Sequence, residues 1–387
     1  MRILAIETSC DDTCISILKA KNSKVEIESN VVSSQVKTHQ KWGGVYPSLA
    51  KREHQKNLVP VLSRAFKKAG LLKNQNPKKN SLLNFKASKN LAERESLLLK
   101  KLSSFLKRYK KPKIGLIAVT AGPGLEPCLW VGINFAKILG DVWQIPVMPV
   151  NHIEAHIFAN LLPQINSKLP YQNLFPALSL IVSGGHTQLI LIKEFGKYRI
   201  LGETRDDAAG ECLDKIARVM GLGYPGGPKI AKESEKYKGE SKYKIELPRP
   251  MIRQKNYDFS FSGLKTAVLY DFKKRPLKER RSKEYIQEMS YNTQQAIIDV
   301  LILKTLKAAK DFKVKTIMIG GGVAANKELR KQFKQKIKER IPRVKYLIPE
   351  IKRCTDNAAM VAITAYSHWS EGKIKSKNIK ANSNYKL

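Results

Sequence analysis

This sequence of 387 residues has few cysteines and lacks a long apolar run. Its five cysteines are odd in number and scattered without a CxxC pair, which excludes a disulfide scaffold and a zinc ribbon. No window approaches the ~18 apolar residues of a membrane-spanning helix. The first apolar run ends at Glu7, before Asp11 and Asp12, so it is too short and too acidic for a signal peptide. We therefore expect a cytoplasmic chain in a reducing compartment, with no membrane partner.

Acidic residues are also scarce. The chain has 33 Asp and Glu against 71 Lys and Arg, which gives a formal net charge of +38. This excess favours a polyanionic partner, for which nucleic acids and anionic membranes are the two classes. A lysine-rich background on solvated faces is the alternative explanation. Apolar residues make up 42% of the chain, enough to bury real cores. At about 150 residues per domain, this length predicts two to three domains.

Short apolar runs alternate with helical patterns along the chain, which is typical of an α/β fold. A strand at residues 2–6 is followed by a polar turn and a second apolar run at 14–18. The same order of strand, small polar turn and strand recurs at 178–182 and 188–192. This recurrence predicts two related lobes with a cleft between them.

The predicted boundaries follow these patterns. We place an N-terminal lobe at residues 1–150, a C-terminal lobe at 151–370 and a disordered basic tail at 371–387. Within the first lobe, residues 73–113 carry 13 Lys or Arg against two Glu and lack strand signals. We interpret this segment as an insertion with one helix near residues 91–109. It is either a solvated surface extension or a contact surface for a phosphate backbone.

Two of the six histidines, His152 and His156, lie four residues apart in the motif HIEAH. On a helix they project from one face and can hold one metal ion. Glu154 points away from that face, so the motif is not the HExxH of zinc proteases. Asp356 is the best-placed third ligand, since a site with two nitrogens and one oxygen leaves positions open for substrate. The alternatives are a pair of capping or core histidines and an Asp356 that only caps a helix.

Two glycine turns each follow an apolar strand, one at residues 183–185 and one at 320–322. Backbone amides without side-chain cover can approach phosphate oxygens or a nucleobase and its ribose. Together with the acidic Glu7, Asp11 and Asp12, these turns indicate a nucleotide site, although each turn alone is also typical of a simple tight turn. The turns do not fit the GxGxxG or P-loop patterns.

The chain resembles the tRNA N6-adenosine threonylcarbamoyltransferases, a family formerly called O-sialoglycoprotein endopeptidases or glycoproteases. The resemblance runs in order from residue 1 to about residue 370 and rests on the motifs ETSCDDT, GPGL, NHIEAHI, VSGGHTQL, DDAAGECLDK, YPGGP, FSFSGLKT, GGVAAN and CTDNAAM. It implies an α/β fold of the actin/Hsp70/sugar-kinase type with two duplicated RNase H-like lobes. It also implies a metal ion and a nucleotide-like substrate in the cleft between the lobes.

The resemblance assigns roles to individual residues. His152, His156 and Asp356 match the metal ligands of the family, which hold one divalent ion, commonly Fe²⁺ or Zn²⁺. Glu7 and Asp11 match acidic positions of the cleft and are the candidate catalytic residues. The positions that match residues binding threonylcarbamoyl-AMP are Ile181, Val182, Ser183, Gly184, Gly185, Asp214, Gly227 and Asn326.

The reaction implied by the resemblance is an acyl transfer. The threonylcarbamoyl group moves from threonylcarbamoyl-AMP to N6 of adenosine 37 in the anticodon loop of tRNAs that read codons beginning with A, and AMP leaves. The implied partners are an inactive paralogue and a small ATPase of the bacterial complex. The chain departs from the family pattern in its longer segment 73–113, at Glu126-Pro127-Cys128 after GPGL, and in its extended tail. We predict that segment 73–113 contributes to tRNA binding.

Three other functions are alternatives. An ATPase or phosphotransferase of the same fold would share the cleft, but such kinases hold Mg²⁺ through carboxylates and phosphates. A metalloprotease needs a general base that Glu154 does not provide. A non-catalytic scaffold would have lost metal ligands or glycine turns, and all of them are present here.

Overall fold

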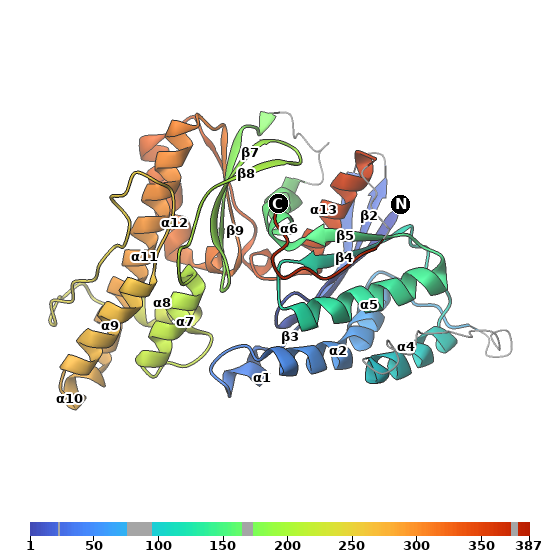
Figure 1. Cartoon of the computed structure of the whole chain (residues 1–387), viewed down its shortest axis with the longest axis horizontal. Helices are drawn as coiled ribbons and strands as arrows, with labels where there is room; N and C mark the ends of the chain where they lie inside the picture. Colours follow the sequence, from blue (N-terminus) through green and yellow to red (C-terminus); the bar gives the residue numbers. More distant parts are fainter. Residues whose placement is uncertain (22–23, 76–94, 165–172, 373–377) are drawn as a thin grey trace. The chain divides into compact units, whose positions relative to one another are not determined.

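The computed structural model describes residues 1–21, 24–75, 95–164, 173–372 and 378–387 (Figure 1). The chain divides into two compact units. The first comprises Met1–Thr38, Val45–Leu169 and Asp356–Leu387, and the second comprises His39–Gly44 and Pro170–Thr355. No helix within the described residues is long and apolar enough to span a membrane.

These units differ from the predicted lobes, which met at residues 150 and 151. The structure assigns the segment from residue 151 to 169, and the chain after residue 355, to the first unit. The physical reason is packing: helix α13 (Ala358–Ser370) contacts strands of the first sheet, although it comes last in the sequence. His152, His156 and Asp356 therefore all belong to the first unit.

The first unit is built around a five-stranded mixed sheet with the order β3-β2-β1-β4-β5. Strand β2 is antiparallel to both β1 and β3, whereas β4 runs parallel to β1 and β5 parallel to β4. The central strands consist almost wholly of buried residues, as expected for a sheet covered on both faces. The strands are β1 (Arg2–Glu7), β2 (Asp12–Lys21), β3 (Lys24–Ser34), β4 (Leu116–Gly122) and β5 (Val147–Asn151).

Helices cover both faces of this sheet (Figure 1). Two helices, α2 (Pro47–Lys68) and α5 (Glu126–Trp143), pack together on one face, and α13 lies on the other with α6 (His152–Phe158) beside it. Helix α4 (Ser96–Arg108) packs on α2. The helix predicted near residues 91–109 is thus present in its described part. The shorter elements are α1 (Val36–Gln40) and η2 (Ala159–Gln164).

The second unit repeats the same topology. Its sheet has the order β10-β9-β6-β7-β8, in which β7 is antiparallel to β6 and β8, and β9 and β10 continue in parallel from β6. This correspondence confirms the predicted duplication. The strands are β6 (Ala177–Val182), β7 (Thr187–Glu194), β8 (Lys197–Glu203), β9 (Thr316–Gly320) and β10 (Lys345–Leu347).

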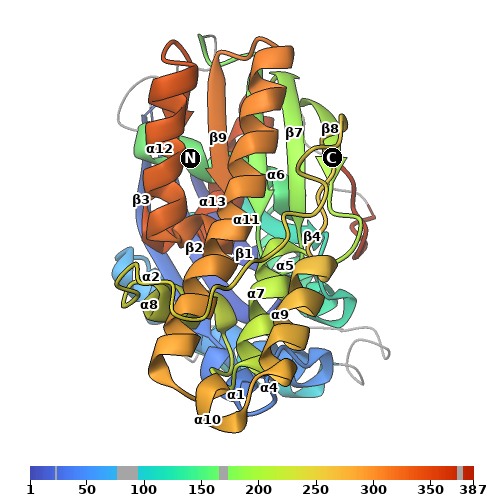
Figure 2. The same ribbon diagram turned by 90° about the vertical axis from the view of Figure 1, so that its left-hand side faces the viewer.

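The helices of the second unit gather around the long helix α11 (Lys283–Asp311). Figure 2 shows α11 and α12 (Lys327–Arg340) side by side over the sheet. A large core joins these helices to the inward faces of β6, β7 and β9. The remaining elements are α7 (Ala209–Val219), α8 (Gly226–Ser234), α9 (Ser262–Lys274), α10 (Leu277–Arg280), η4 (Gly322–Ala325) and η5 (Ile351–Arg353).

The prediction of a disordered tail is wrong for its described part, residues 378–387. Ile379 is 4% exposed and belongs to the core of the first unit. Its carbonyl oxygen accepts a hydrogen bond from Lys137 Nζ at 2.7 Å, and the Asn382 amide donates to the Ala121 carbonyl at 2.9 Å. The Lys- and Asn-rich composition concealed a few apolar residues and backbone groups that find partners only in the folded chain.

Candidate metal centre and substrate-binding residues

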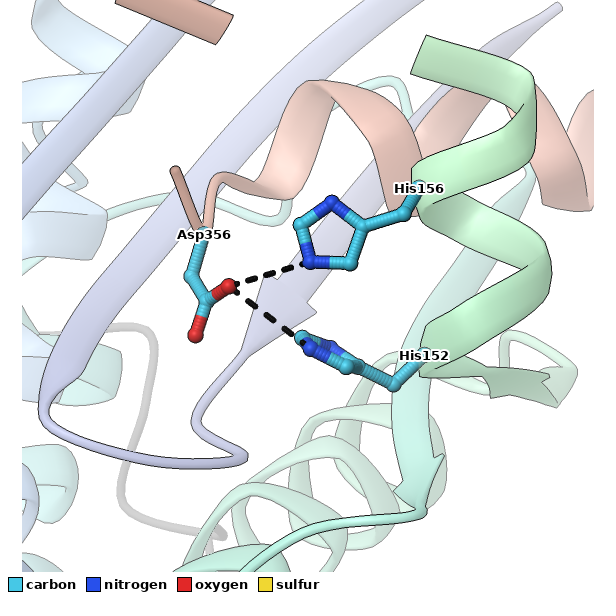
Figure 3. Close-up of side chains that lie close together, drawn as sticks. All are labelled: His152, His156 and Asp356. Atoms are coloured by element: carbon cyan, nitrogen blue, oxygen red, sulfur yellow. Dashed lines mark ion pairs between the residues drawn. The ribbon is translucent and has the colours of Figure 1, made fainter. Parts of the chain in front are cut away.

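The two histidines of HIEAH lie on α6, which begins directly after strand β5. Asn151 caps this helix: its Oδ1 accepts hydrogen bonds from the amides of Ile153 at 2.8 Å and Glu154 at 3.1 Å. His152 and His156 then project from one face of the helix, one turn apart, toward Asp356 (Figure 3). Both histidine side chains are buried.

Asp356 completes a group of three potential ligands. Its Oδ1 lies 3.2 Å from His156 Nε2 and 3.6 Å from His152 Nε2, and the three ligand atoms are within 4.8 Å of one another. The residue that caps α13 is the next one, Asn357, whose Oδ1 accepts a hydrogen bond from the Met360 amide at 3.2 Å. Asp356 is therefore not the helix cap, and its carboxylate is directed at the histidines.

The donor set fits a divalent transition metal. Both ring nitrogens of His156 are buried; Nε2 faces the Asp356 carboxylate at 3.2 Å, whereas Nδ1 has no hydrogen-bond partner, which is rare for a buried polar group in a folded protein. A metal ion held by these residues would take Nε2 of each histidine and an oxygen of Asp356 as its ligands. Two imidazoles and one carboxylate suit Zn²⁺ or Fe²⁺ and leave coordination positions open.

Glu7 holds His152 from the side opposite Asp356. The Glu7 side chain is fully buried, and its Oε2 lies 3.0 Å from His152 Nδ1. Thr120 Oγ1 donates to the same oxygen at 2.6 Å, and the Ser9 amide donates to Oε1 at 2.6 Å. With Nδ1 donating to Glu7, the Nε2 atom of His152 is the one left for a metal, as is usual for histidine ligands.

The charges of this cluster compensate one another. Burial acts to raise the pKa of the Glu7 carboxyl, but the charge and hydrogen bond of His152 lower it overall. Burial acts to lower the pKa of His152, but the charges of Glu7 and Asp356 raise it to about 9. Burial and the neighbouring charge of His152 lower the pKa of His156. Without a metal, the His152 imidazolium is thus the positive group between two carboxylates.

The other acidic residues of the first turn have different surroundings. The Asp11 carbonyl oxygen accepts a hydrogen bond from the Gln35 amide at 3.1 Å, and its side chain is not one of the three grouped ligands. Asp12 Oδ1 is buried without a hydrogen-bond partner. Burial, together with the charge of Asp356, raises the pKa of Asp12 to about 7. The Asp12 carboxyl is therefore expected to change its protonation state near pH 7.

Sequence reasoning did not identify His368. Its Nε2 lies 2.9 Å from Glu154 Oε2, so a hydrogen bond joins α6 to α13, the helix that follows Asp356. Glu154 thus pairs with His368 rather than with the three candidate ligands, as the helical spacing predicts. No local pattern could have indicated this pair, because 214 residues separate its members.

The predicted substrate-binding residues all lie in the second unit. Ile181 and Val182 are fully buried at the end of β6. Gly184 and Gly185 follow them, and both are exposed, with open space where a side chain would project. The glycine turn after β9 lies close by, because Ile181 pairs with Gly320 across the parallel strands. The two turns thus share one edge of the sheet.

The side chains of Asp214 and Asn326 accept hydrogen bonds from backbone amides at the starts of two helices. Asp214 Oδ1 accepts a hydrogen bond from the Gly226 amide at 2.6 Å, at the start of α8, where Gly227 follows. Asn326 Oδ1 caps α12 by accepting from the Leu329 amide at 2.9 Å. Its Nδ2 donates to Gln294 Oε1 at 2.7 Å, which fixes the orientation of the side chain.

Two solved structures of HypF are similar to this chain in fold. The full-length HypF in its phosphate- and nucleotide-bound form aligns with a TM-score of 0.50 and 10% identity over 97% of this chain. T. kodakarensis HypF aligns with a TM-score of 0.52 and 14% identity over 98%. The chain spans about half the length of those proteins, 56% and 49%. The likeness agrees with the predicted two-lobed α/β fold of the actin/Hsp70/sugar-kinase type.

Sequence comparison gives the family. The model of the tRNA N6-adenosine threonylcarbamoyltransferase family matches residues 26–76 and 85–363. The enzyme of that name from Persephonella marina is 44% identical over 96% of this chain and 91% of its own length. Those from Thermosipho africanus and Bacillus subtilis are 42% and 40% identical, over 100% and 96% of this chain and 100% and 92% of their own lengths. The chain belongs to this family, which confirms the resemblance seen in its motifs.

Proposed function

We propose that this chain transfers the threonylcarbamoyl group from threonylcarbamoyl-AMP to N6 of adenosine 37 in tRNAs reading codons that begin with A, with release of AMP. The main support is the full-length similarity to tRNA N6-adenosine threonylcarbamoyltransferases. The convergence of His152, His156 and Asp356 adds a site that a phosphotransferase of the same fold does not require. In this proposal the substrate is tRNA, and the reaction takes place in the cytoplasm.

The metal site proposed for this reaction consists of His152, His156 and Asp356, with one Fe²⁺ or Zn²⁺ ion. When bound, the ion polarises the acyl group and offsets phosphate charge. Glu7 acts as a positioning residue, because its carboxylate is buried and occupied by His152, Thr120 and the Ser9 amide. Of the two predicted catalytic residues, Asp11 is the one with partial exposure.

We assign threonylcarbamoyl-AMP to the residues of the second unit. The uncovered backbone at Gly184 and Gly185 allows close approach of a phosphate or acyl group. Asp214, Gly227 and Asn326 are the candidates for the adenosine part: Asp214 accepts from the Gly226 amide at the start of α8, beside Gly227, and Asn326 caps α12. The candidates Ile181, Val182 and Ser183 lie at and directly after the end of β6, next to Gly184 and Gly185.

The proposed partners are tRNA, an inactive paralogue and a small ATPase. For tRNA, the described part of segment 73–113 offers a defined surface at the end of α4. Leu98, Leu102 and Phe105 bury the inner face of this helix. The exposed cations at and beyond its end are Lys107, Arg108, Lys110, Lys111 and Lys113. Because α4 is part of the core, substitution of these cations tests RNA binding better than deletion of the segment.

The test is a transfer assay with purified chain, threonylcarbamoyl-AMP, tRNA and the candidate partner proteins, read by nucleoside mass spectrometry. We expect modified adenosine with the unchanged chain and its loss in His156→Ala and Asp356→Asn. A matched control is His54→Ala, which removes a buried histidine bonded to Thr13 Oγ1 at 2.8 Å and the Cys10 carbonyl at 2.9 Å.

Two results would contradict the proposal. Full modification by both ligand variants would remove the metal site from the mechanism. Turnover of ATP by the chain alone, without tRNA modification in the presence of any partner, would favour the phosphotransferase alternative.

A further inference from the structure

Residues 378–387, which we call the C-terminal strap, lie across the loop that follows β4. Figure 1 draws the strap in dark red. Its first anchor is Ile379 in the core, and its second is the backbone around Asn382. The Asn382 amide donates to the Ala121 carbonyl at 2.9 Å, and the Gly124 amide donates to the Ser383 carbonyl at 3.4 Å. The strap is thus held at several points along its length.

The loop beneath the strap is shaped to receive it. A Cβ atom at Gly122 would lie 1.8 Å from the Asn382 carbonyl oxygen and 3.0 Å from Tyr385 Cβ. Only glycine permits this approach. Gly122 also pairs with Asn151 across β4 and β5, so the strap crosses the sheet where the metal-binding helix begins.

The third anchor reaches that helix directly. Asn151 Nδ2 donates a hydrogen bond to the Tyr385 carbonyl at 2.9 Å, while Oδ1 of the same side chain caps α6. One amide side chain therefore links the strap to the helix that carries both histidines.

We propose that the C-terminal strap positions His152 and His156 by fixing the Asn151 side chain that caps α6. The inference rests on the metal site proposed above. An asparagine amide can rotate to exchange its oxygen and nitrogen, and the surrounding hydrogen bonds decide which orientation is kept. With the Tyr385 carbonyl accepting from Nδ2, only Oδ1 can face the amides of α6.

Without the strap, Oδ1 still faces the amides of α6, but the side chain loses the Nδ2 hydrogen bond that holds it in this orientation. The helix has only seven residues, so it depends on its cap and packing more than a long helix would. His152 is the first residue of the helix, directly after the cap. A frayed first turn would therefore displace His152 relative to His156 and Asp356.

The experiment compares two truncations of the full chain. Removal of residues 385–387 deletes the acceptor for Asn151, whereas removal of 386–387 leaves a terminal carboxylate on Tyr385 that can still accept. Each protein is titrated with Co²⁺, whose visible absorption reports ligand geometry. We expect about five- to tenfold weaker Co²⁺ binding after removal of 385–387, comparable to losing a helix cap, and little change after removal of 386–387.

Hydrogen exchange in metal-free protein gives a second readout. We expect faster exchange at the amides of Ile153 and Glu154 when residues 385–387 are absent. Asn151→Asp should restore their protection in that truncated chain, because either carboxylate oxygen can accept from the helix. If the strap stabilised the first unit without orienting Asn151, Asn151→Asp would not restore this protection.

Unchanged Co²⁺ affinity and unchanged exchange after removal of 385–387 would overturn the inference, even if the protein became less stable. If that truncation does not fold, Gly122→Ala in the full chain, whose Cβ would displace the strap at the Asn382 carbonyl while leaving Asn151 in place, decides by the same two readouts. Absence of Co²⁺ binding by the unchanged chain would instead refute the metal site. The exchange measurement would then still test whether the strap orders α6.

Discussion

Replacing Glu7 by glutamine tests the arrangement of the metal centre most directly. The substitution keeps the size of the side chain but removes the charge that accepts from His152 Nδ1 at 3.0 Å. Residues that orient histidine ligands in this way typically contribute 10- to 100-fold to metal affinity, or roughly 1.4–2.7 kcal/mol. We expect a loss of this size for Glu7→Gln, measured as the dissociation constant for Co²⁺ at constant pH.

A matched control separates this effect from general destabilisation. Glu288 is also buried and accepts hydrogen bonds from Ser241 Oγ, the Tyr243 amide and the Ile245 amide, but it lies in the second unit. Both Glu7→Gln and Glu288→Gln should lower the free energy of unfolding by about 1–3 kcal/mol, because each leaves buried partners poorly matched. Only Glu7→Gln should weaken Co²⁺ binding. Equal Co²⁺ affinity in the two variants would refute the orienting role.

Three further predictions concern other parts of the chain. The pKa of Asp12 lies near 7 in the fold, so the stability contributed by its protonated carboxyl should be fully present below about pH 4 and fall by roughly 2 kcal/mol between pH 5 and 7. Asp12→Asn should remove this loss in urea unfolding of metal-free protein, and an unchanged pH slope would contradict it. Gly321→Ala should destabilise the second unit by more than about 1 kcal/mol, since φ is 90° and a Cβ would lie 2.4 Å from the carbonyl oxygen ending β6. Gly184→Ala, which meets open space, should keep its melting temperature. Substituting Lys110 and Lys111 by glutamine should lower the salt slope of tRNA binding by about one per lost contact, and an unchanged slope would exclude this surface.

Local patterns were sufficient for much of the site. The spacing of His152 and His156 predicts two imidazoles on one helical face, and the structure places them there. The repeated order of strand, turn and strand likewise predicted the duplicated lobes, because hairpin and glycine-turn signals are set by neighbouring residues. The same signals placed the glycine turns at the ends of buried strands.

Long-range contacts decided the rest. Whether Asp356 faces the histidines or caps α13 depended on Asn357 taking the cap and on α13 returning to the first sheet. Glu7 was identifiable as an acidic residue after a strand, but its role depends on His152, 145 residues away. The last ten residues are ordered because Ile379 packs in the core and Asn151 bonds the Tyr385 carbonyl, and the composition of the tail could not reveal these contacts. The sequence alone determined the elements and the chemistry available, whereas only packing between distant segments decided which groups meet, because burial and hydrogen-bond partners arise from the folded chain as a whole.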